Sequence, residues 1–414
     1  MAVETGNAWV PFLQRYGRST PDFEADAAGD SGSAPEATPP DFEADAGGDS
    51  GSAPEATQAA LSPPPTLGDE LRTIYPLAQE HIDTFRAKHF VRLKNVVPPE
   101  ILAAVRERII ALATPACGGV NPSLPRPGVP LPPTRDARWA VLAEPATRSW
   151  HLQMMWAVEP TVRSLVLSPR IGGIVAALLG CEERGVRLYH DNTLSRAPGC
   201  KRTRWHCDDG PNGYMAMASS DVVTVWIPLQ RTTPAMGSLC FAATPPAEGD
   251  GGDDTAAAAA AADDAAADEA ARVAGSRGPS RRCDSWSVAA RDRCPANEQS
   301  DAYDAFVARA LQSRGLLPDE ATYELGDISI HRSDCFHTAG PNLTESVRMI
   351  VGTTYFASGA TMRDDIDLAS APKGIANDWA KFCPGVQPGE PIATRRNPLL
   401  EAPQLDPGAA AALH

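Results

Sequence analysis

Apolar side chains in the first part of the globular sequence recur with a helical spacing. Positions three or four residues apart are apolar in three segments, which predicts helices at residues 77–88, 100–113 and 169–179. Gly180 directly follows the third segment, as is common where a helix ends. Between the first two segments, residues 89–95 alternate between apolar and polar side chains, which predicts a short β-strand.

After residue 180 the period of the pattern shortens. Runs rich in β-branched and aromatic residues are separated by clusters of Gly, Pro, Asn and Asp, which predicts strands at residues 186–190, 222–229, 238–242, 327–331 and 347–356. Helices followed by many short strands indicate a mainly β protein with flanking helices (α+β). In such a fold a β-sandwich or small barrel is supported by helices on one face.

Two stretches of biased composition interrupt this pattern. Residues 21–57 hold a nearly exact tandem repeat with ten acidic residues and no Lys or Arg, and residues 247–297 include an alanine run. Such segments bury too little apolar surface to offset the entropy of ordering them. We therefore expect a disordered acidic region at residues 1–66. Residues 67–414 are expected to form one folded domain with a low-complexity insertion at about 247–297.

The net charge of −15 comes mainly from these two stretches, so the remaining chain is close to neutral. Nine cysteines are scattered without a CxxC pair, which is typical of a reduced intracellular protein rather than a disulfide scaffold. The sequence shows no long apolar leader at its N-terminus and no span near 18 apolar residues. We therefore expect a cytoplasmic protein that does not contact a membrane.

Candidate chemistry begins at the run Arg204-Trp-His-Cys-Asp-Asp-Gly210. His206 and Asp208 are two residues apart, so on a strand they point to the same side, whereas Asp209 does not share that side. His337, from another predicted strand, can complete a set of two imidazoles and one carboxylate. That set suits ferrous iron and leaves coordination positions open.

Arg348 follows His337 by eleven residues, with a Gly-Pro-Asn turn between them. We expect the two residues to lie on adjacent antiparallel strands and to point into one cavity. The alternative for Arg348 is an ordinary surface ion pair.

Together these residues give the chain a specific resemblance to the phytanoyl-CoA dioxygenase family of iron(II) and 2-oxoglutarate oxygenases, which extends from about Leu77 to about Leu400. The motifs that carry it are Tyr189-His-Asp191, Trp205-His-x-Asp208, Val225-Trp-Ile-Pro-Leu229, Gly237-Ser-Leu239 and His337-x-x-Gly-Pro-Asn342 followed by Arg348. The resemblance implies a double-stranded β-helix (jelly-roll or cupin-like) core in a catalytic domain spanning residues 67–414.

The resemblance also implies roles for individual residues. His206, Asp208 and His337 would be the catalytic iron ligands, and Arg348 would pair with the distal carboxylate of the cosubstrate 2-oxoglutarate. Because the 2-oxoacid end must chelate iron, the other carboxylate lies deep in the barrel, where a bidentate arginine offsets the cost of burying its charge. Trp226 is expected either to form a wall of the cosubstrate pocket or to be a core residue.

The implied reaction is hydroxylation of a C–H bond in a small organic or acyl substrate. It uses Fe(II), 2-oxoglutarate and O2, releases succinate and CO2, and has ascorbate as a stimulant. Halogenases of this fold have a small residue at the carboxylate position so that halide can bind iron, so Asp208 favours a hydroxylase. Acyl-CoA, a free metabolite and a protein side chain all fit the motif as substrates.

Several residues admit two interpretations. His331 is either an outer partner of the metal site or a structural strand residue. A basic cluster before the metal motif either receives an anionic substrate or is a solvated loop; its members are Arg196, Lys201, Arg202 and Arg204.

Three other functions remain as alternatives. They are a non-catalytic metal-binding or scaffolding module on the same fold, a nucleic-acid dealkylase and a zinc-dependent hydrolase. No basic stripe interleaved with aromatic residues occurs, so we expect no nucleic-acid partner.

Overall fold

The computed structural model describes residues 69–116, 149–208, 215–217, 221–244, 301–364, 368 and 373–403. The expectations for residues 1–66 and 247–297 lie outside these ranges. Helices and 3-10 turns of the described chain are η2 (Asp69–Arg72), α2 (Gln79–Lys88), α3 (Pro99–Ala116), η3 (Met155–Ala157), α4 (Pro160–Val166), α5 (Pro169–Leu179), η5 (Pro234–Met236), α8 (Asp301–Ser313) and α9 (Lys373–Phe382). The three predicted helices are confirmed as α2, α3 and α5.

The strands form two antiparallel sheets. The larger sheet has the order β1 (Phe90–Leu93), β8 (Ile328–Arg332), β5 (Val222–Pro228), β10 (Arg348–Ala357), β3 (Val186–Arg196) and β2 (Ser149–Gln153). The smaller sheet has the order β4 (Thr203–His206), β9 (His337–Ala339), β6 (Leu239–Ala243) and β7 (Leu317–Glu320). Non-consecutive strands are therefore neighbours throughout, as in a jelly roll, and the predicted mainly β fold with flanking helices is confirmed.

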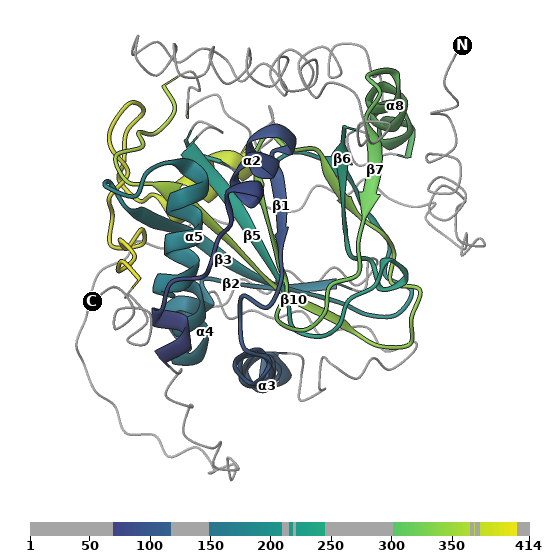
Figure 1. Ribbon diagram of the computed structural model, residues 1–414, viewed down its shortest axis with the longest axis horizontal. Coiled ribbons are helices and arrows are strands. Elements are labelled where there is room, and N and C mark those ends of the chain that lie inside the picture. The colour runs from purple at the N-terminus through teal and green to yellow at the C-terminus, as the bar shows by residue number, and fades with distance from the viewer. Residues whose placement is uncertain are drawn as a thin grey trace, which may run out of the picture.

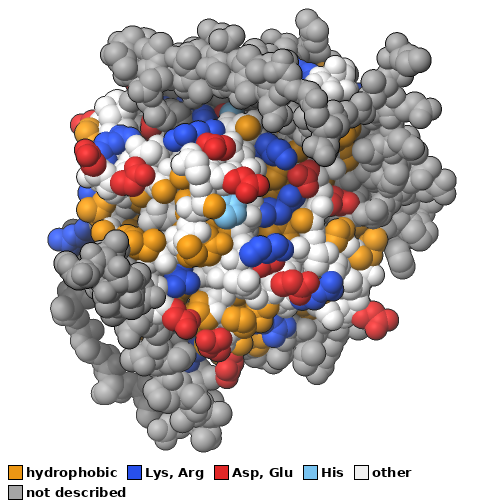
Figure 2. All heavy atoms as spheres, in the orientation of Figure 1, with side chains coloured by type: hydrophobic (Ala, Val, Ile, Leu, Met, Phe, Trp, Pro, Cys, Tyr) orange, Lys and Arg blue, Asp and Glu red, His pale blue; other side chains and the backbone are white. Residues whose placement is uncertain are grey.

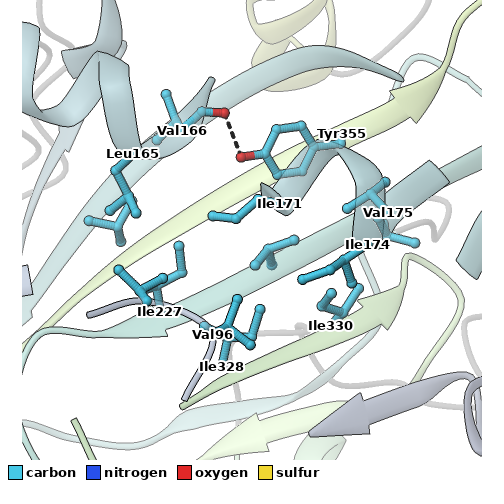
Figure 3. Close-up of a cluster of buried hydrophobic side chains, with 14 of the residues drawn as sticks. Val96, Leu165, Val166, Ile171, Ile174, Val175, Ile227, Ile328, Ile330 and Tyr355 are labelled. Atoms are coloured by element: carbon cyan, nitrogen blue, oxygen red, sulfur yellow. Dashed lines mark hydrogen bonds between the residues drawn. The ribbon is translucent and has the colours of Figure 1, made fainter. Parts of the chain in front are cut away.

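The outer face of the larger sheet is apolar and packs on helices. Along β5 the side chains of Val223, Val225 and Ile227 belong to the same buried cluster as residues of α4 and α5. Figure 3 shows this cluster, in which the Tyr355 hydroxyl donates a hydrogen bond to the carbonyl oxygen of Val166 at 2.7 Å. Because strand side chains alternate, the residues between these three point to the opposite face.

That opposite, inner face packs on the smaller sheet. Trp226 of β5 and Ile350 of β10 share a buried cluster with Leu239 and Phe241 of β6. In Figure 1, α4 and α5 lie on one side of the larger sheet, and β6 and β7 lie on the other. The space between the two sheets is therefore where side chains of both can meet.

Helix α5 shows how local sequence sets a boundary. Ser168 accepts a hydrogen bond from the backbone N–H of Ile171, Pro169 occupies the first turn, and Gly180 ends the helix with a left-handed φ of 60°. Residues Pro160–Leu179 are long and apolar enough to cross a membrane, so the expectation of no such span is wrong. In the structure they form α4 and α5, and 61% of their most apolar 18-residue stretch is buried inside the protein, as in the core helices of a folded domain.

Candidate metal centre

Two histidines meet where strands β4 and β9 pair. His206 is the last residue of β4, His337 is the first residue of β9, and the two are directly opposite each other in the antiparallel register. Their ring centroids lie 4.2 Å apart. Asp208 lies beside them, and one ligand-capable atom from each of the three residues lies within 4.8 Å of the others. The structure therefore brings together the three residues of the predicted set.

Asp208 reaches this position by a different route from the one expected. Strand β4 ends at His206, so Asp208 lies in a bend beyond the strand, and strand alternation does not orient it. Asp209, the alternative carboxylate, lies outside the described residues. Asp208 is 6% exposed, and its orientation is set by the contacts of its two oxygens.

Both histidines have one ring nitrogen bound to the backbone. The Nδ1 atom of His206 lies 2.8 Å from the carbonyl oxygen of Arg204, and the Nδ1 atom of His337 lies 2.9 Å from the carbonyl oxygen of Cys335. A carbonyl oxygen only accepts, so in each neutral ring Nδ1 carries the proton and donates it. The Nε2 atom of each ring is left with its lone pair, the form in which histidine binds a metal.

The two oxygens of Asp208 have different surroundings. Oδ1 lies 3.9 Å from Nε2 of His206 and 3.8 Å from Nε2 of His337. Oδ2 accepts a hydrogen bond from the Thr224 hydroxyl at 3.0 Å and lies 3.5 Å from Nε2 of His331. Thus one oxygen faces the two free imidazole nitrogens, and the other is held by residues of the larger sheet.

Protonation states favour a bound cation. Burial, together with a neighbouring imidazole, lowers the pKa of His206 and of His337 to about 4. Burial by itself raises the pKa of Asp208, but His337, His331 and His206 together outweigh burial and hold that pKa below its usual range. His337 is the more enclosed of the two, with a side chain that is 7% exposed against 41% for His206. At neutral pH the three groups are two neutral imidazoles and one carboxylate, as metal ligation requires.

A row of polar side chains crosses the inner face of the larger sheet beneath Asp208. The register pairs His331 of β8 with Thr224 of β5, Thr224 with Thr354 of β10, and Thr354 with His190 of β3. The hydroxyls of Thr224 and Thr354 lie 3.3 Å apart. The position of His331 favours its interpretation as an outer partner of the site. Thr224 was not predicted as a site residue, although it is a polar residue on the same face of β5 as Trp226.

Arg348 is a fully buried cation at the start of β10, with 1% exposure. One Nη atom donates to the carbonyl oxygen of Gly237, while Nε has no hydrogen-bond partner. Within the described residues no carboxylate lies within ion-pair distance of the guanidinium. Burial lowers the pKa of Arg348 well below its usual range, and Arg196, directly opposite on β3, lowers it further. A surface ion pair is therefore excluded for Arg348, and a buried anionic ligand would fit it.

The prediction that His337 and Arg348 lie on adjacent antiparallel strands is wrong. They do not lie on adjacent strands: β9, with His337, is in the smaller sheet, and β10, with Arg348, is in the larger sheet. The Gly-Pro-Asn turn crosses from one sheet to the other instead of forming a hairpin. Asn342 fixes this crossing, since its side-chain amide donates to the carbonyl oxygens of Arg196 and Ser346.

Gly237 supports the Arg348 side chain in a way that only glycine allows. Its φ is 85°, and a Cβ atom there would lie 2.4 Å from the carbonyl oxygen of Gly340. This close approach places the Gly237 carbonyl against Arg348. Trp226 is 5% exposed and packs on Tyr323 with ring centroids 4.9 Å apart, so it is a core residue of the inner face.

The basic cluster before the metal motif is divided among local contacts. Arg202 forms an ion pair with Asp304 of α8. Arg196 donates to the backbone carbonyl of Lys201 and to the hydroxyl of Thr203. These contacts favour a structural role for both arginines, whereas the Lys201 side chain is exposed.

The described cysteines test the expectation of a reduced protein. Cys181, Cys200, Cys240, Cys335 and Cys383 are free and buried, as expected for reduced residues. Cys207, between His206 and Asp208, is disulfide-bonded, which the expectation of a reduced chain did not include.

The class of protein to which this fold and this site correspond is that of the iron- and 2-oxoglutarate-dependent oxygenases. Within that class, a family model for Phytanoyl-CoA dioxygenase (PhyH) matches residues 85–276, which include His206 and Asp208. Over these residues the predicted resemblance to this family is confirmed. A search of curated proteins gives no match.

Three solved structures illustrate the similarity of the fold. The epimerase SnoN from nogalamycin biosynthesis has 15% identity and a TM-score of 0.48, over 78% of this chain and 98% of its own. The carbocyclase SnoK from the same biosynthesis has 18% identity and a TM-score of 0.47, over 79% and 97%. EctD from S. alaskensis, with 2-oxoglutarate and 5-hydroxyectoine, has 15% identity and a TM-score of 0.46, over 86% and 98%.

Proposed function

We propose that the chain is an Fe(II)- and 2-oxoglutarate-dependent dioxygenase that hydroxylates a C–H bond of a small organic or acyl substrate. In this proposal His206, Asp208 and His337 hold the iron, and Arg348 binds the distal carboxylate of 2-oxoglutarate. The observation that carries it is the buried Arg348 guanidinium, which lacks a carboxylate among the described residues. A buried charge without a partner is costly, so a site that retains one is built for an anion that arrives with a ligand.

The donor set fits ferrous iron. His206, Asp208 and His337 would hold the metal through two neutral imidazoles and one carboxylate, a set that would leave coordination positions for a chelating cosubstrate and oxygen. When bound, iron with 2-oxoglutarate and O2 supplies the oxidising power for the reaction, and succinate and CO2 are the other products. The chain's own contribution is to hold these groups in place and to exclude water.

Each part of the site has a defined task in this proposal. The carbonyl oxygens of Arg204 and Cys335 hold the imidazole protons at Nδ1, so that both Nε2 atoms face the metal. Thr224 binds Oδ2 of Asp208, which leaves Oδ1 for a monodentate contact. Such outer contacts orient ligands and raise metal affinity.

The cosubstrate lies between the two sheets in this proposal. Arg348 offers a planar fork to a carboxylate, and its Nε, which has no hydrogen-bond partner, is one of the donors of that fork. Trp226 and Ile350 belong to the apolar cluster on the same inner face, where they exclude water from the buried carboxylate. We further propose that residues 67–414 form the catalytic domain and that the segment 247–297 lies outside its metal core.

Turnover measured on the purified full chain tests this function. The protein is supplied with Fe(II), ascorbate and 2-oxoglutarate, and succinate release is screened against fractions of a metabolite extract. Products are then analysed by mass, because a gain of one oxygen identifies hydroxylation, whereas an unchanged oxygen content indicates epimerisation or ring closure. Succinate release that requires Fe(II) and O2 supports the proposal.

Two outcomes would contradict the proposal. Metal-dependent turnover that persists with zinc and without O2 would indicate a hydrolase. Metal binding without succinate release in any fraction, and without binding of 2-oxoglutarate, would indicate a non-catalytic metal-binding module.

A further inference from the structure

The polar row on the inner face continues beyond the metal centre toward strands β3 and β2. His190 lies two strands from Thr224, which corresponds to about 10 Å across the sheet. Asn192 shares the face of His190 and is paired with Gln153 of the edge strand β2. Asn192 and Gln153 are only half-buried. A strip of imidazole and amide groups therefore leads from the metal centre to a more open edge of the sheet.

The end of helix α9 brings a cation to this strip. The Lys381 ammonium donates a hydrogen bond to the side-chain oxygen of Gln153. The next residue, Phe382, stacks on the ring of His190 with centroids 4.4 Å apart and an interplanar angle of 23°. The Lys381 ammonium also lies 5.2 Å from the centre of the Phe382 ring. These contacts fix Lys381 over the strip rather than in solvent.

The charge of Lys381 is incompletely balanced. The side chain is half-buried, and no carboxylate of the described residues lies within 4 Å of its ammonium. Burial lowers the pKa of Lys381, Asp378 opposes this effect, and Arg396 lowers the pKa further. The Arg396 guanidinium lies close to Lys381, since it donates a hydrogen bond to the backbone carbonyl of Lys381. An ammonium that is partly removed from water and has mainly neutral partners favours an additional anionic ligand.

We propose that Lys381, together with Gln153 and Asn192, binds an acidic group of the prime substrate, a carboxylate or a phosphate. This inference rests on the proposed function and names the substrate class for the same site. His190 lies on the strip between Thr224 and this group, two strands and about 10 Å from Thr224, so in this proposal the acidic group is several bonds from the carbon that is oxidised. The basic cluster near the metal motif is the weaker candidate, because Arg202 and Arg196 already bind groups of the protein.

Anion binding to the loaded full chain tests this proposal. The protein is saturated with Fe(II) and 2-oxoglutarate under anaerobic conditions, so that Arg348 is already engaged. Its unfolding temperature is then followed against inorganic phosphate and, separately, against acetate, at constant ionic strength. The two titrations show whether the site prefers phosphate or carboxylate.

Three variants show whether Lys381 is the residue that binds the anion. Lys381→Gln removes the charge but keeps a hydrogen-bonding chain of similar length, and we expect the midpoint of the preferred anion to rise about tenfold, as for the loss of one charge-assisted hydrogen bond. Lys381→Arg keeps the charge, and its midpoint should stay within about threefold of the wild-type value. Lys201→Gln removes an exposed lysine of the basic cluster, and its midpoint should not change.

Wild-type midpoints in Lys381→Gln, a loss in Lys201→Gln instead, or no anion effect on the wild-type protein would each overturn the proposal. The absorbance of the iron and 2-oxoglutarate complex in the same samples reports the proposed function separately. If that absorbance is missing from the wild-type protein, the proposed function fails, whereas the dependence of anion binding on Lys381 is still read from the unfolding temperatures.

Discussion

Replacing Arg348 by Ala should weaken 2-oxoglutarate binding far more than iron binding. Arg348 is 1% exposed, and the described residues place no carboxylate beside it, so under the proposed function its partner is the distal carboxylate of 2-oxoglutarate. In the variant, the distal carboxylate must enter the same buried space without a cation. Breaking one side of a buried charge pair costs about 3 to 5 kcal/mol. Because each 1.4 kcal/mol is about tenfold, the dissociation constant should rise by about two orders of magnitude or more.

The assay is an anaerobic titration of the Fe(II)-loaded protein with 2-oxoglutarate, followed by the absorbance of the complex. Arg348→Lys retains a cation but loses the planar fork, so it should recover only part of the lost affinity. Iron affinity, measured in the absence of 2-oxoglutarate, should change little in either variant. Equal midpoints in the wild type and both variants would refute the reasoning, because another residue would then hold the cosubstrate.

A companion variant separates ligand binding from folding. Arg348→Met replaces the cation by an apolar chain of similar length. Without 2-oxoglutarate the wild-type protein carries the cost of the buried charge, whose pKa is held well below its usual range by burial and by Arg196. The metal-free Met variant should therefore unfold at the same temperature or higher, while its stabilisation by 2-oxoglutarate is lost. A lower unfolding temperature would indicate that the arginine is mainly a structural residue.

The metal centre gives three further predictions. Each of His206→Ala, Asp208→Ala and His337→Ala should abolish iron binding, measured by metal analysis after desalting, while the circular dichroism spectrum is retained. Wild-type iron content in all three variants would contradict the assignment of these residues as iron ligands. Burial lowers the pKa of both histidines to about 4, so they stay neutral below their ordinary titration range. The affinity for Co(II), followed by the visible absorbance of the bound ion, should therefore fall near pH 4 to 5. A fall centred near pH 6.5 would contradict the burial argument. Thr224→Val removes the hydrogen bond to Asp208 and should lower Co(II) affinity by about tenfold. The control Thr354→Val leaves that hydrogen bond in place and should not lower the affinity. Equal affinities in the two variants would exclude Thr224 as a positioning residue.

Much of the fold could be predicted from periodicity alone. Helix α5 begins and ends at the predicted residues because Pro169 and Gly180 are strong local signals. Strands β5 and β10 were found within one or two residues because they are long and apolar. The bounds of strands β4 and β9 were not predicted, because these strands contain four and three residues, too few to show a period.

The candidate site was predictable where residues are close in sequence. His206 and Asp208 form a local motif, and His337 and Arg348 were recognised through their spacing and family resemblance. Thr224, Gln153 and Lys381 were missed because each acquires its neighbours only through strand pairing or helix docking. The same limit explains the wrong placement of β9 beside β10, since a turn sequence does not show whether the chain stays in one sheet.

The division of the site between the two sheets has a consequence for how the protein holds together. His206 and His337 belong to the smaller sheet, while Thr224, which binds Asp208, and Arg348 belong to the larger one. Under the proposed function, a bound metal ion and cosubstrate would connect the two sheets through polar contacts that the apolar clusters do not supply. Separation of the sheets would then require release of the ligands, so the concentrations of iron and 2-oxoglutarate would set the resistance of the protein to local opening and to proteolysis.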